Sequence, residues 1–411
     1  MGTHLNDLRS QWRIRDVRLV LSASFVNSLG TGLYLASYAL YALRSDVGAE
    51  QLSLALSIGG VVALLSAPIG AKSAERYGSL RLTVLLNIGR GLATLALVVS
   101  SSYVFALVIF VLTVLDRFAF PATQTVLAAV SAKGDRSVIL SSRQLTQTLG
   151  TLCGAGIAGL LQLAASNDSL LSLLVAANGL SFLANALMYS RLPSETGPPR
   201  KQPLPWRVGW PARSMSLLLV ASIVLDSGGL IVSLGFPLVL VTTKSALVTW
   251  VGALVAVETG VGVVTLSLIG KYVKTSSDAA GALVIGALTS VGACLLLGFL
   301  GTDAAGVLVT ASVALGIGST LASYSVYFFV IEEASPDFVS RHLAAYGVAG
   351  STQRVITPWV LTGLALAASS LYGWCALAVL LLLAGGVAFA AARAATRLTQ
   401  PLEPVADDKH A

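Results

Sequence analysis

The sequence predicts an all-α membrane protein in which twelve transmembrane helices form two six-helix repeats. Three observations point to this fold class. Hydrophobic residues make up 55% of the chain and charged residues only 11%, whereas soluble domains carry about 25% charged residues. Apolar runs of about 20 residues recur along the whole chain. The second half of the chain also repeats features of the first.

The apolar runs are long enough for helices to cross the ~30 Å hydrocarbon layer of a bilayer. The first run, of about 24 residues, exceeds the ~7–15 apolar residues of a signal peptide and therefore counts as a span. We expect twelve spans, near residues 19–42, 51–70, 82–100, 104–130, 139–164, 170–189, 215–241, 248–269, 280–300, 306–330, 343–368 and 374–392.

The connector between the sixth and seventh spans is rich in proline, which cannot continue a helix. It divides the chain into two units with short connectors inside each. The predicted organisation is an N-terminal six-helix half at 1–189, a cytoplasmic linker at 190–213, a C-terminal six-helix half at 214–394 and a cytoplasmic tail at 395–411.

A shift of about 200 residues aligns the two halves. Residues 23–26 match 221–224, and residues 69–70 match 269–270, at the ends of the second and eighth spans. Agreement on one offset indicates duplication. Transporters built from two parallel six-span repeats hold their substrate at the interface of the repeats.

The distribution of basic residues predicts the orientation in the membrane. If both termini are cytoplasmic, twenty of the 26 Lys and Arg residues lie in inside segments, and only Arg44 and Lys244 lie in outside loops. This bias follows the positive-inside rule. It predicts a multi-pass protein of the inner or plasma membrane, and it explains the net charge of +7 without a nucleic-acid partner.

No residue pattern indicates a cofactor, a metal site or an enzyme. The three cysteines lie in apolar segments and the three histidines are scattered along the chain, so neither set suggests metal ligands. No glycine-rich phosphate loop followed by Lys-Ser/Thr occurs. We therefore expect a protein without cofactors, metals or catalytic residues.

The connector at 70–81 reads Gly-Ala-Lys-Ser-Ala-Glu-Arg-Tyr-Gly-Ser-Leu-Arg. With this connector and twelve spans, the chain resembles the major facilitator superfamily, whose pattern here is Gly-x-Leu-Ala-Asp-Arg-x-Gly-Arg-Lys. Ala71 departs from the pattern. The resemblance covers the whole chain and implies the major facilitator fold, with a charge relay that closes the cytoplasmic side. The matching residues, which form the expected cytoplasmic gate, are Glu75, Arg76, Gly78 and Arg81.

Two further stretches are similar to bacterial drug, macrolide and siderophore exporters of that superfamily. Residues 120–122 read Phe-Pro-Ala, shortly after Arg117 in the fourth span, and exporters often carry an arginine there. The glycine-rich stretch at 150–159 resembles their motif in the fifth span but lacks its proline. Its glycines favour close helix packing. This resemblance implies export.

Six charged residues lie inside the apolar runs. A charge at the centre of a bilayer costs at least about 2.5–3.5 kcal/mol on insertion scales, so it is rarely present without a partner or a function. These residues are expected to mark a polar pathway through the membrane. They are Arg90, Asp116, Arg117, Asp226, Glu258 and Arg354.

The three acids among them, Asp116, Asp226 and Glu258, are the candidates for proton coupling. Burial and neighbouring charges together decide whether such a carboxyl exchanges protons near neutral pH. The alternative is a static ion pair with Arg90 or Arg354. Pairing across the two halves is a further possibility, because the repeat assigns three of the six charges to each half.

Eight residues within the spans are candidates to line a substrate cavity. An unpaired amide is costly in hydrocarbon, the aromatic residues would suit amphipathic compounds, and Arg90 with Arg354 could bind an anionic group. The eight are Asn27, Tyr34, Arg90, Arg117, Gln124, Gln147, Tyr324 and Arg354.

Together these observations predict a secondary active transporter that exports small amphipathic molecules, such as a drug or secondary metabolite, by proton antiport with alternating access. Its expected partners are a small-molecule substrate, protons and the lipid bilayer, and we expect a monomer. Two alternatives stay open. One is a proton-coupled uptake symporter for an organic anion, and the other is a lipid flippase.

Overall fold

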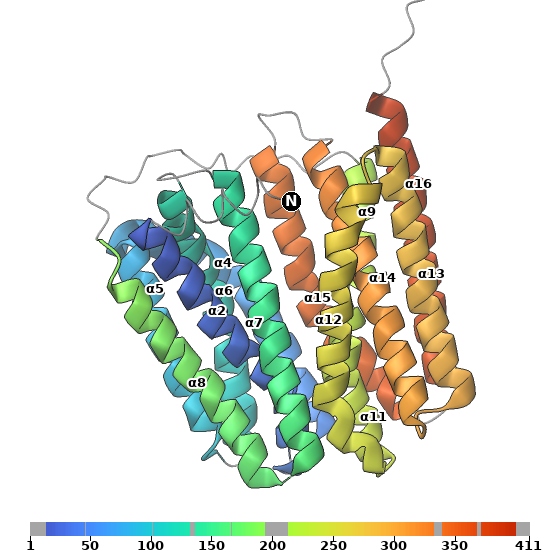
Figure 1. The fold of residues 1–411 in the computed structure, drawn as a ribbon, viewed down its shortest axis with the longest axis horizontal. Helices are drawn as coiled ribbons and strands as arrows, with labels where there is room; N and C mark the ends of the chain where they lie inside the picture. The colour runs from blue at the N-terminus through green and yellow to red at the C-terminus, as the bar shows by residue number, and fades with distance from the viewer. Residues whose placement is uncertain are drawn as a thin grey trace, which may run out of the picture.

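The computed structural model of the chain describes residues 14–45, 47–100, 102–131, 136–165, 167–193, 213–332, 339–367 and 371–399. In these ranges all regular structure is helical, and the helices lie side by side in a bundle (Figure 1). Most of the predicted linker and tail falls outside the described residues. The boundaries of the two predicted halves stay a prediction.

The first six expected spans coincide with helices of the structure. We call these the first-repeat helices. They are α2 (Arg15–Leu35) with α3 (Tyr38–Arg44), α4 (Ala49–Tyr77), α5 (Ser79–Leu97), α6 (Ser102–Ser131), α7 (Arg136–Ala164) and α8 (Asp168–Ser190).

The last six expected spans also coincide with helices, which we call the second-repeat helices. The seventh span consists of α9 (Arg213–Leu225), α10 (Gly228–Leu230), the π-helical turn η1 (Ile231–Gly235) and α11 (Phe236–Thr242). The others are the 3₁₀ turn η2 (Ala246–Trp250) with α12 (Val251–Tyr272), α13 (Ser276–Leu300), α14 (Ala305–Glu332), α15 (Val339–Ala367) and α16 (Leu371–Thr399).

Eight helices in the described part of the chain are long and apolar enough to cross a membrane, and the bent pair α2 and α3 makes a ninth. The helices α4, α7 and α15 do not meet that test. All three pack against the other repeat, α4 against α15 and α7 against α12. Polar residues on these faces bond across the repeats: Ser53 and Ser57 of α4 contact α15, and Gln162 of α7 contacts α12. The all-helical fold is confirmed, and the count of twelve crossings is consistent with it.

Two spans are interrupted. The first bends by 41° between α2 and α3, at Ala36 and Ser37. The seventh breaks after Leu225, where Asp226 and Ser227 form a turn, and then passes through η1. A helix end leaves backbone N–H and C=O groups without intrahelical partners. Both interruptions therefore place backbone groups inside the bundle where the regular helical hydrogen bonds are broken.

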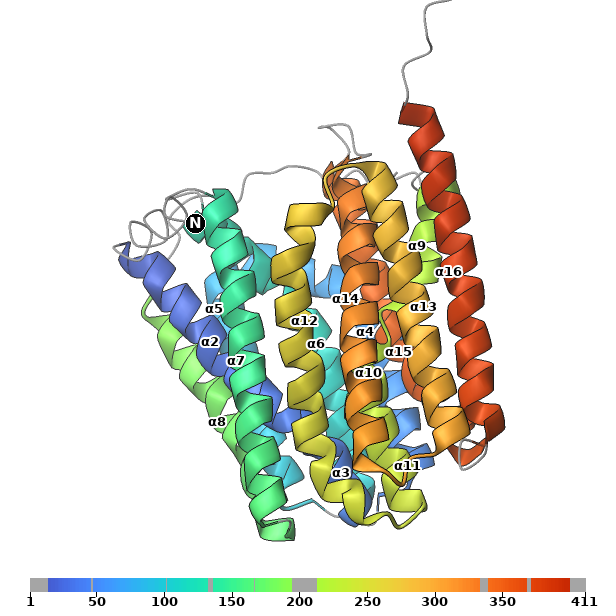
Figure 2. The same cartoon turned by 45° about the vertical axis from the view of Figure 1, so that its right-hand side comes forward.

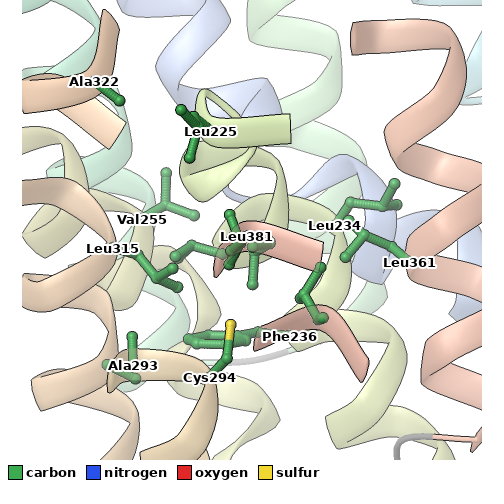
Figure 3. Packing of buried hydrophobic residues seen from close by; sticks show 14 of the residues in the cluster. Leu225, Leu234, Phe236, Val255, Ala293, Cys294, Leu315, Ala322, Leu361 and Leu381 are labelled. Carbon is green, nitrogen blue, oxygen red and sulfur yellow. The ribbon is translucent and has the colours of Figure 1, made fainter. Parts of the chain in front are cut away.

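Within each repeat the helices pack closely. α2 lies against α7 and α8, and α4 against α6; in the second repeat α13 lies between α14 and α16. α7 and α12 lie side by side where the repeats meet (Figure 2). The packing is tight around the interrupted seventh span, where Leu234 and Phe236 meet Leu361 of α15 and Leu381 of α16 (Figure 3). This core lies in the same span as the break, which carries the half-buried Asp226.

Candidate functional site

One carboxylate joins helices from both repeats. Asp116 on α6 accepts from Arg90 on α5, with 2.5 Å between Nη2 and Oδ1. Its other oxygen, Oδ2, lies 3.7 Å from Nη1 of Arg354 on α15. From the sequence, these three residues were separate candidates for proton coupling or for the substrate cavity. The structure brings them together into one ion cluster that spans the interface of the repeats.

Arg90 is held from several sides. Its guanidinium lies over the ring of Phe182 on α8, 4.1 Å from the centroid, in a cation–π arrangement. Its Nη1 donates to Asn87 at 3.4 Å, and Asn87 donates in turn to Asn185 of α8 at 3.2 Å. Only 17% of the Arg90 side chain is exposed, against 63% for Arg354. Arg90 is therefore fixed, whereas Arg354 is largely free to move.

Arg117 adds a third guanidinium to the cluster. It follows Asp116 directly on α6, and consecutive residues point about 100° apart on a helix, so the two do not pair face to face. Arg117 is half-buried and interacts electrostatically with both Asp116 and Arg354. Three arginines thus surround a single carboxylate, which leaves an excess of two positive charges when all four residues are ionised.

Asp226 and Glu258 form a different environment, at the break of the seventh span. Asp226 accepts a hydrogen bond from the hydroxyl of Ser323 on α14 at 2.7 Å. Glu258 on α12 accepts from Thr259 at 3.2 Å. A Cβ built on Gly229 would lie 3.3 Å from Oε1 of Glu258, so the carboxyl packs directly against the broken helix.

Within the described residues, neither Asp226 nor Glu258 takes part in an ion pair. The static pairing considered for these acids with Arg90 or Arg354 is therefore not seen, because both arginines lie at Asp116. A second neighbour of Asp226 is Tyr346 of α15, which interacts with it electrostatically. No cation among the described residues therefore neutralises either carboxyl group.

The remaining cavity candidates are dispersed. Tyr34 stacks on Tyr38, with ring centroids 4.7 Å apart, and so packs at the bend of the first span. Tyr324 is half-buried on α14, as are Gln124 on α6 and Gln147 on α7. On α2, the Oδ1 atom of Asn27 is buried without a hydrogen-bond partner among the described residues.

The expected cytoplasmic gate is a very short turn. α4 continues to Tyr77, so Glu75 and Arg76 lie in its last turn, and α5 begins at Ser79. Gly78 alone connects the helices, with a φ of 88° that favours glycine. Glu75, Arg76 and Arg81 are exposed, and no ion pair joins them to one another or to another described residue. The charge relay stays a prediction.

The glycines of the fifth span bring helix backbones together. A Cβ on Gly150 would lie 2.7 Å from the carbonyl oxygen of Phe25, and one on Gly154 would lie 2.9 Å from the backbone nitrogen of Leu33. Only residues without a side chain allow α7 and α2 to approach so closely. These glycines serve packing.

Sequence reasoning missed several residues that shape the site. Phe182 and Asn185 hold the Arg90 region, Ser323 and Tyr346 lie near Asp226, and Gln162 joins the two repeats. The uncharged polar residues inside apolar spans were a usable signal, because each needs a partner there. Phe182 and Tyr346 could not be recognised from the sequence, since isolated aromatic residues are common in apolar helices.

A family model described as Major Facilitator Superfamily matches residues 20–358. Among solved structures, the nucleoside transporter NupG is similar with a TM-score of 0.67 and 12% identity, over 94% of this chain and 100% of that one. A bacterial homologue of the iron transporter ferroportin is similar with a TM-score of 0.68 and 14% identity, over 92% of this chain and 99% of that one. A bacterial homologue of the human lysosomal transporter Spinster has a TM-score of 0.66 and 16% identity, over 96% of this chain and 99% of that one.

At identities this low, similarity to the solved structures shows the fold alone and says nothing about the substrate. No curated protein is significantly similar to the chain.

Proposed function

The chain belongs to the major facilitator superfamily, and on that premise we propose that it is a proton-coupled transporter that exports small amphipathic molecules by antiport. Family membership makes it a multi-pass membrane transporter of a small-molecule substrate. Proton coupling, export and the class of substrate are the proposed steps beyond that.

The observation that carries the proposal is the state of Asp226 and Glu258. Both carboxyl groups lie within apolar spans, accept hydrogen bonds from hydroxyl groups, and have no ion pair in the described residues. Either can gain or lose a proton without breaking a salt bridge. Asp116, in contrast, is held by two arginines. Of the three candidate acids, we assign proton transfer to Asp226 and Glu258 and a structural role to Asp116.

The position of these acids supports coupling to conformational change. Asp226 lies in the break of the seventh span and Glu258 packs on Gly229 beside it. In our proposal the halves at 1–189 and 214–394 move as units around a central site, with both termini cytoplasmic and the protein a monomer. Protonation changes the facing state only if the two states bind the proton with different affinity.

A second candidate function is proton-coupled uptake of an organic anion. The specific observation in its favour is the excess of arginine around Asp116, where Arg117 and Arg354 have no other acid within the described cluster. An uncompensated positive charge inside a membrane protein is costly. An anionic substrate that bound there would remove that cost.

The first experiment tests export. The protein is expressed in a host without its own efflux pumps, and the accumulation of a compound library is measured with and without a protonophore. We expect at least one amphipathic compound to accumulate less than in cells with empty vector, and the protonophore to abolish that difference. Unchanged accumulation for every compound would refute export.

A second experiment distinguishes antiport from symport by the direction of proton movement. The purified protein is reconstituted into liposomes that contain a pH dye, and substrate is added outside. A substrate that enters by antiport drives protons out and raises the internal pH, whereas a substrate that enters with protons lowers it. Liposomes without protein serve as the control.

A further inference from the structure

The two repeats touch at the end of the bundle that holds α3 and α11. On α4, Ser53 contacts Thr362 of α15, and the hydroxyl of Ser57 donates to the carbonyl of Val355 at 2.9 Å. On the other side of the interface, α7 crosses the start of α12. The predicted orientation makes this the outward-facing end. These contacts therefore close the pathway on the outer side.

The crossing of α7 and α12 brings two backbones into direct contact. A Cβ on Gly159 would lie 2.5 Å from the backbone nitrogen of Ala253, and one on Gly252 would lie 2.7 Å from the Cα of Gly159. No side chain fits between the helices there. The contact is consequently dry, and polar groups around it must find partners within the protein.

Gln162 supplies those partners. Its side chain is 0% exposed and lies three residues after Gly159, which is the spacing of neighbours on one helix face. Its Nε2 donates to the carbonyl oxygen of Ala36 at 3.0 Å. Its Oε1 accepts from the backbone N–H of Gly252 at 3.2 Å. One buried amide thus joins a first-repeat backbone to a second-repeat backbone.

Both backbone groups need such a partner because of where they lie. Ala36 follows the last residue of α2, and its carbonyl oxygen lies at the interruption, where the regular series of backbone hydrogen bonds ends. Gly252 lies in the first turn of α12, directly after η2, and its N–H cannot reach a carbonyl of α12 itself. Separation of α7 from α12 would leave Gly252 and Gln162 each with an unsatisfied group until water enters.

We propose that Gln162 is the positioning residue that holds the outer end of the pathway closed, and that it sets the balance between the two facing states. This inference rests on the proposed transport function for its physiological meaning. The closure itself is a property of the chain that can be measured without substrate or proton gradient.

The test uses a disulfide as a reporter of closure. Cys153, Cys294 and Cys375 are replaced by alanine, and Ser53→Cys with Thr362→Cys are introduced at the neighbouring α4–α15 contact. Because the two side-chain oxygens touch, cysteines there meet the short Cβ separation of a disulfide when this end is closed. The rate of cross-linking by a mild oxidant in membranes then reports the closed population.

Gln162→Leu removes both hydrogen bonds. Only the bond to Gly252 crosses between the repeats, and its loss is worth a factor of about five in equilibrium, so we expect cross-linking to slow about fivefold. Gln162→Glu keeps an acceptor for Gly252 but cannot donate to Ala36, and should give an intermediate rate. Gln144→Leu, an exposed position of the same helix, is the matched control and should cross-link at the parent rate.

A second reporter guards against loss of folding. Ser37→Cys, buried at the bend of the first span, should react about fivefold faster with a membrane-impermeant maleimide from outside when Gln162→Leu is present. Size-exclusion profiles identify variants that do not fold, and Gln162→Glu then decides. Parent rates in both assays would overturn the proposal. If Gln162→Leu slows cross-linking and speeds the maleimide reaction, but the parent protein transports no compound, the role of Gln162 is upheld and the proposed function is refuted.

Discussion

Arg354 on α15 lies 3.7 Å from Asp116 on α6, although the two helices belong to different repeats. The arginine side chain is 63% exposed, and exposed ion pairs contribute about 0–1 kcal/mol. The contact from Arg90 to the same carboxylate is shorter and more buried. Asp116 is therefore held more tightly within its own repeat than to the other, which is what the proposed movement of the two halves requires.

Replacement of Asp116 by Asn should destabilise the protein by roughly 1–3 kcal/mol, because it leaves the mostly buried guanidinium of Arg90 without its charged partner. The measurement is thermal unfolding in detergent. Asp168→Asn is the control, since Asp168 pairs with Arg44 at 3.4 Å with its side chain 74% exposed. Equal losses in the two variants would show that the cluster contributes no more than a surface pair.

Replacement of Arg354 by Gln should leave the unfolding temperature almost unchanged, because the side chain is mostly exposed. If the substrate is anionic, the KM should rise about tenfold to a hundredfold, which corresponds to the loss of one charge-assisted hydrogen bond of ~1.5–3 kcal/mol. Arg354→Lys keeps the charge and should recover part of the affinity. An unchanged KM for Arg354→Gln would remove the support for an organic-anion substrate.

Asp226→Asn and Glu258→Gln remove a titratable group and keep the size of each side chain. We expect at least one of them to abolish substrate-driven proton movement in liposomes while substrate-for-substrate exchange continues, because exchange needs no change in protonation. Exchange is followed with labelled substrate, and proton movement with a pH dye. Normal proton movement in both variants would exclude these acids as the proton carriers.

Gly154→Ala should destabilise the protein, since the added methyl group meets the backbone of Leu33 at 2.9 Å and forces α7 from α2. The control lies two residues along the same helix: a Cβ on Gly156 has no neighbouring atom within 4 Å. Gly156→Ala should be neutral or stabilising by up to about 1 kcal/mol, from helix propensity. Thermal unfolding of both variants measures the difference, and equal effects would contradict the packing role.

The positions of the helices could be predicted from the sequence because length and hydropathy decide them locally. The bend of the first span could not, because Ala36 and Ser37 carry no proline or glycine to mark it. The role of Gln162 depends on that bend and was hidden for the same reason. Gly150 and Gly154 were interpreted correctly as packing residues, because their spacing on one helix face is itself the signal.

The pairing of the buried charges was also beyond the sequence. Arg90, Asp116 and Arg354 were all recognised as costly inside an apolar span. Which acid meets which arginine depends on the rotation and depth of three separate helices, and no local pattern encodes these. Only the division of the charges between the repeats indicated that pairs could form across the interface, as Asp116 and Arg354 do.

The absence of an ion pair at Asp226 and Glu258 among the described residues has a consequence for electroneutrality. The charges of Arg90, Arg117 and Arg354 are balanced only while Asp116, Asp226 and Glu258 are all ionised. Each proton taken up by Asp226 or Glu258 gives the membrane interior one positive charge in excess, which is unfavourable there. An anion that enters at the arginines restores neutrality, whereas a neutral or cationic compound does not. Charge balance alone would then link proton and anion movement, even between groups that never touch.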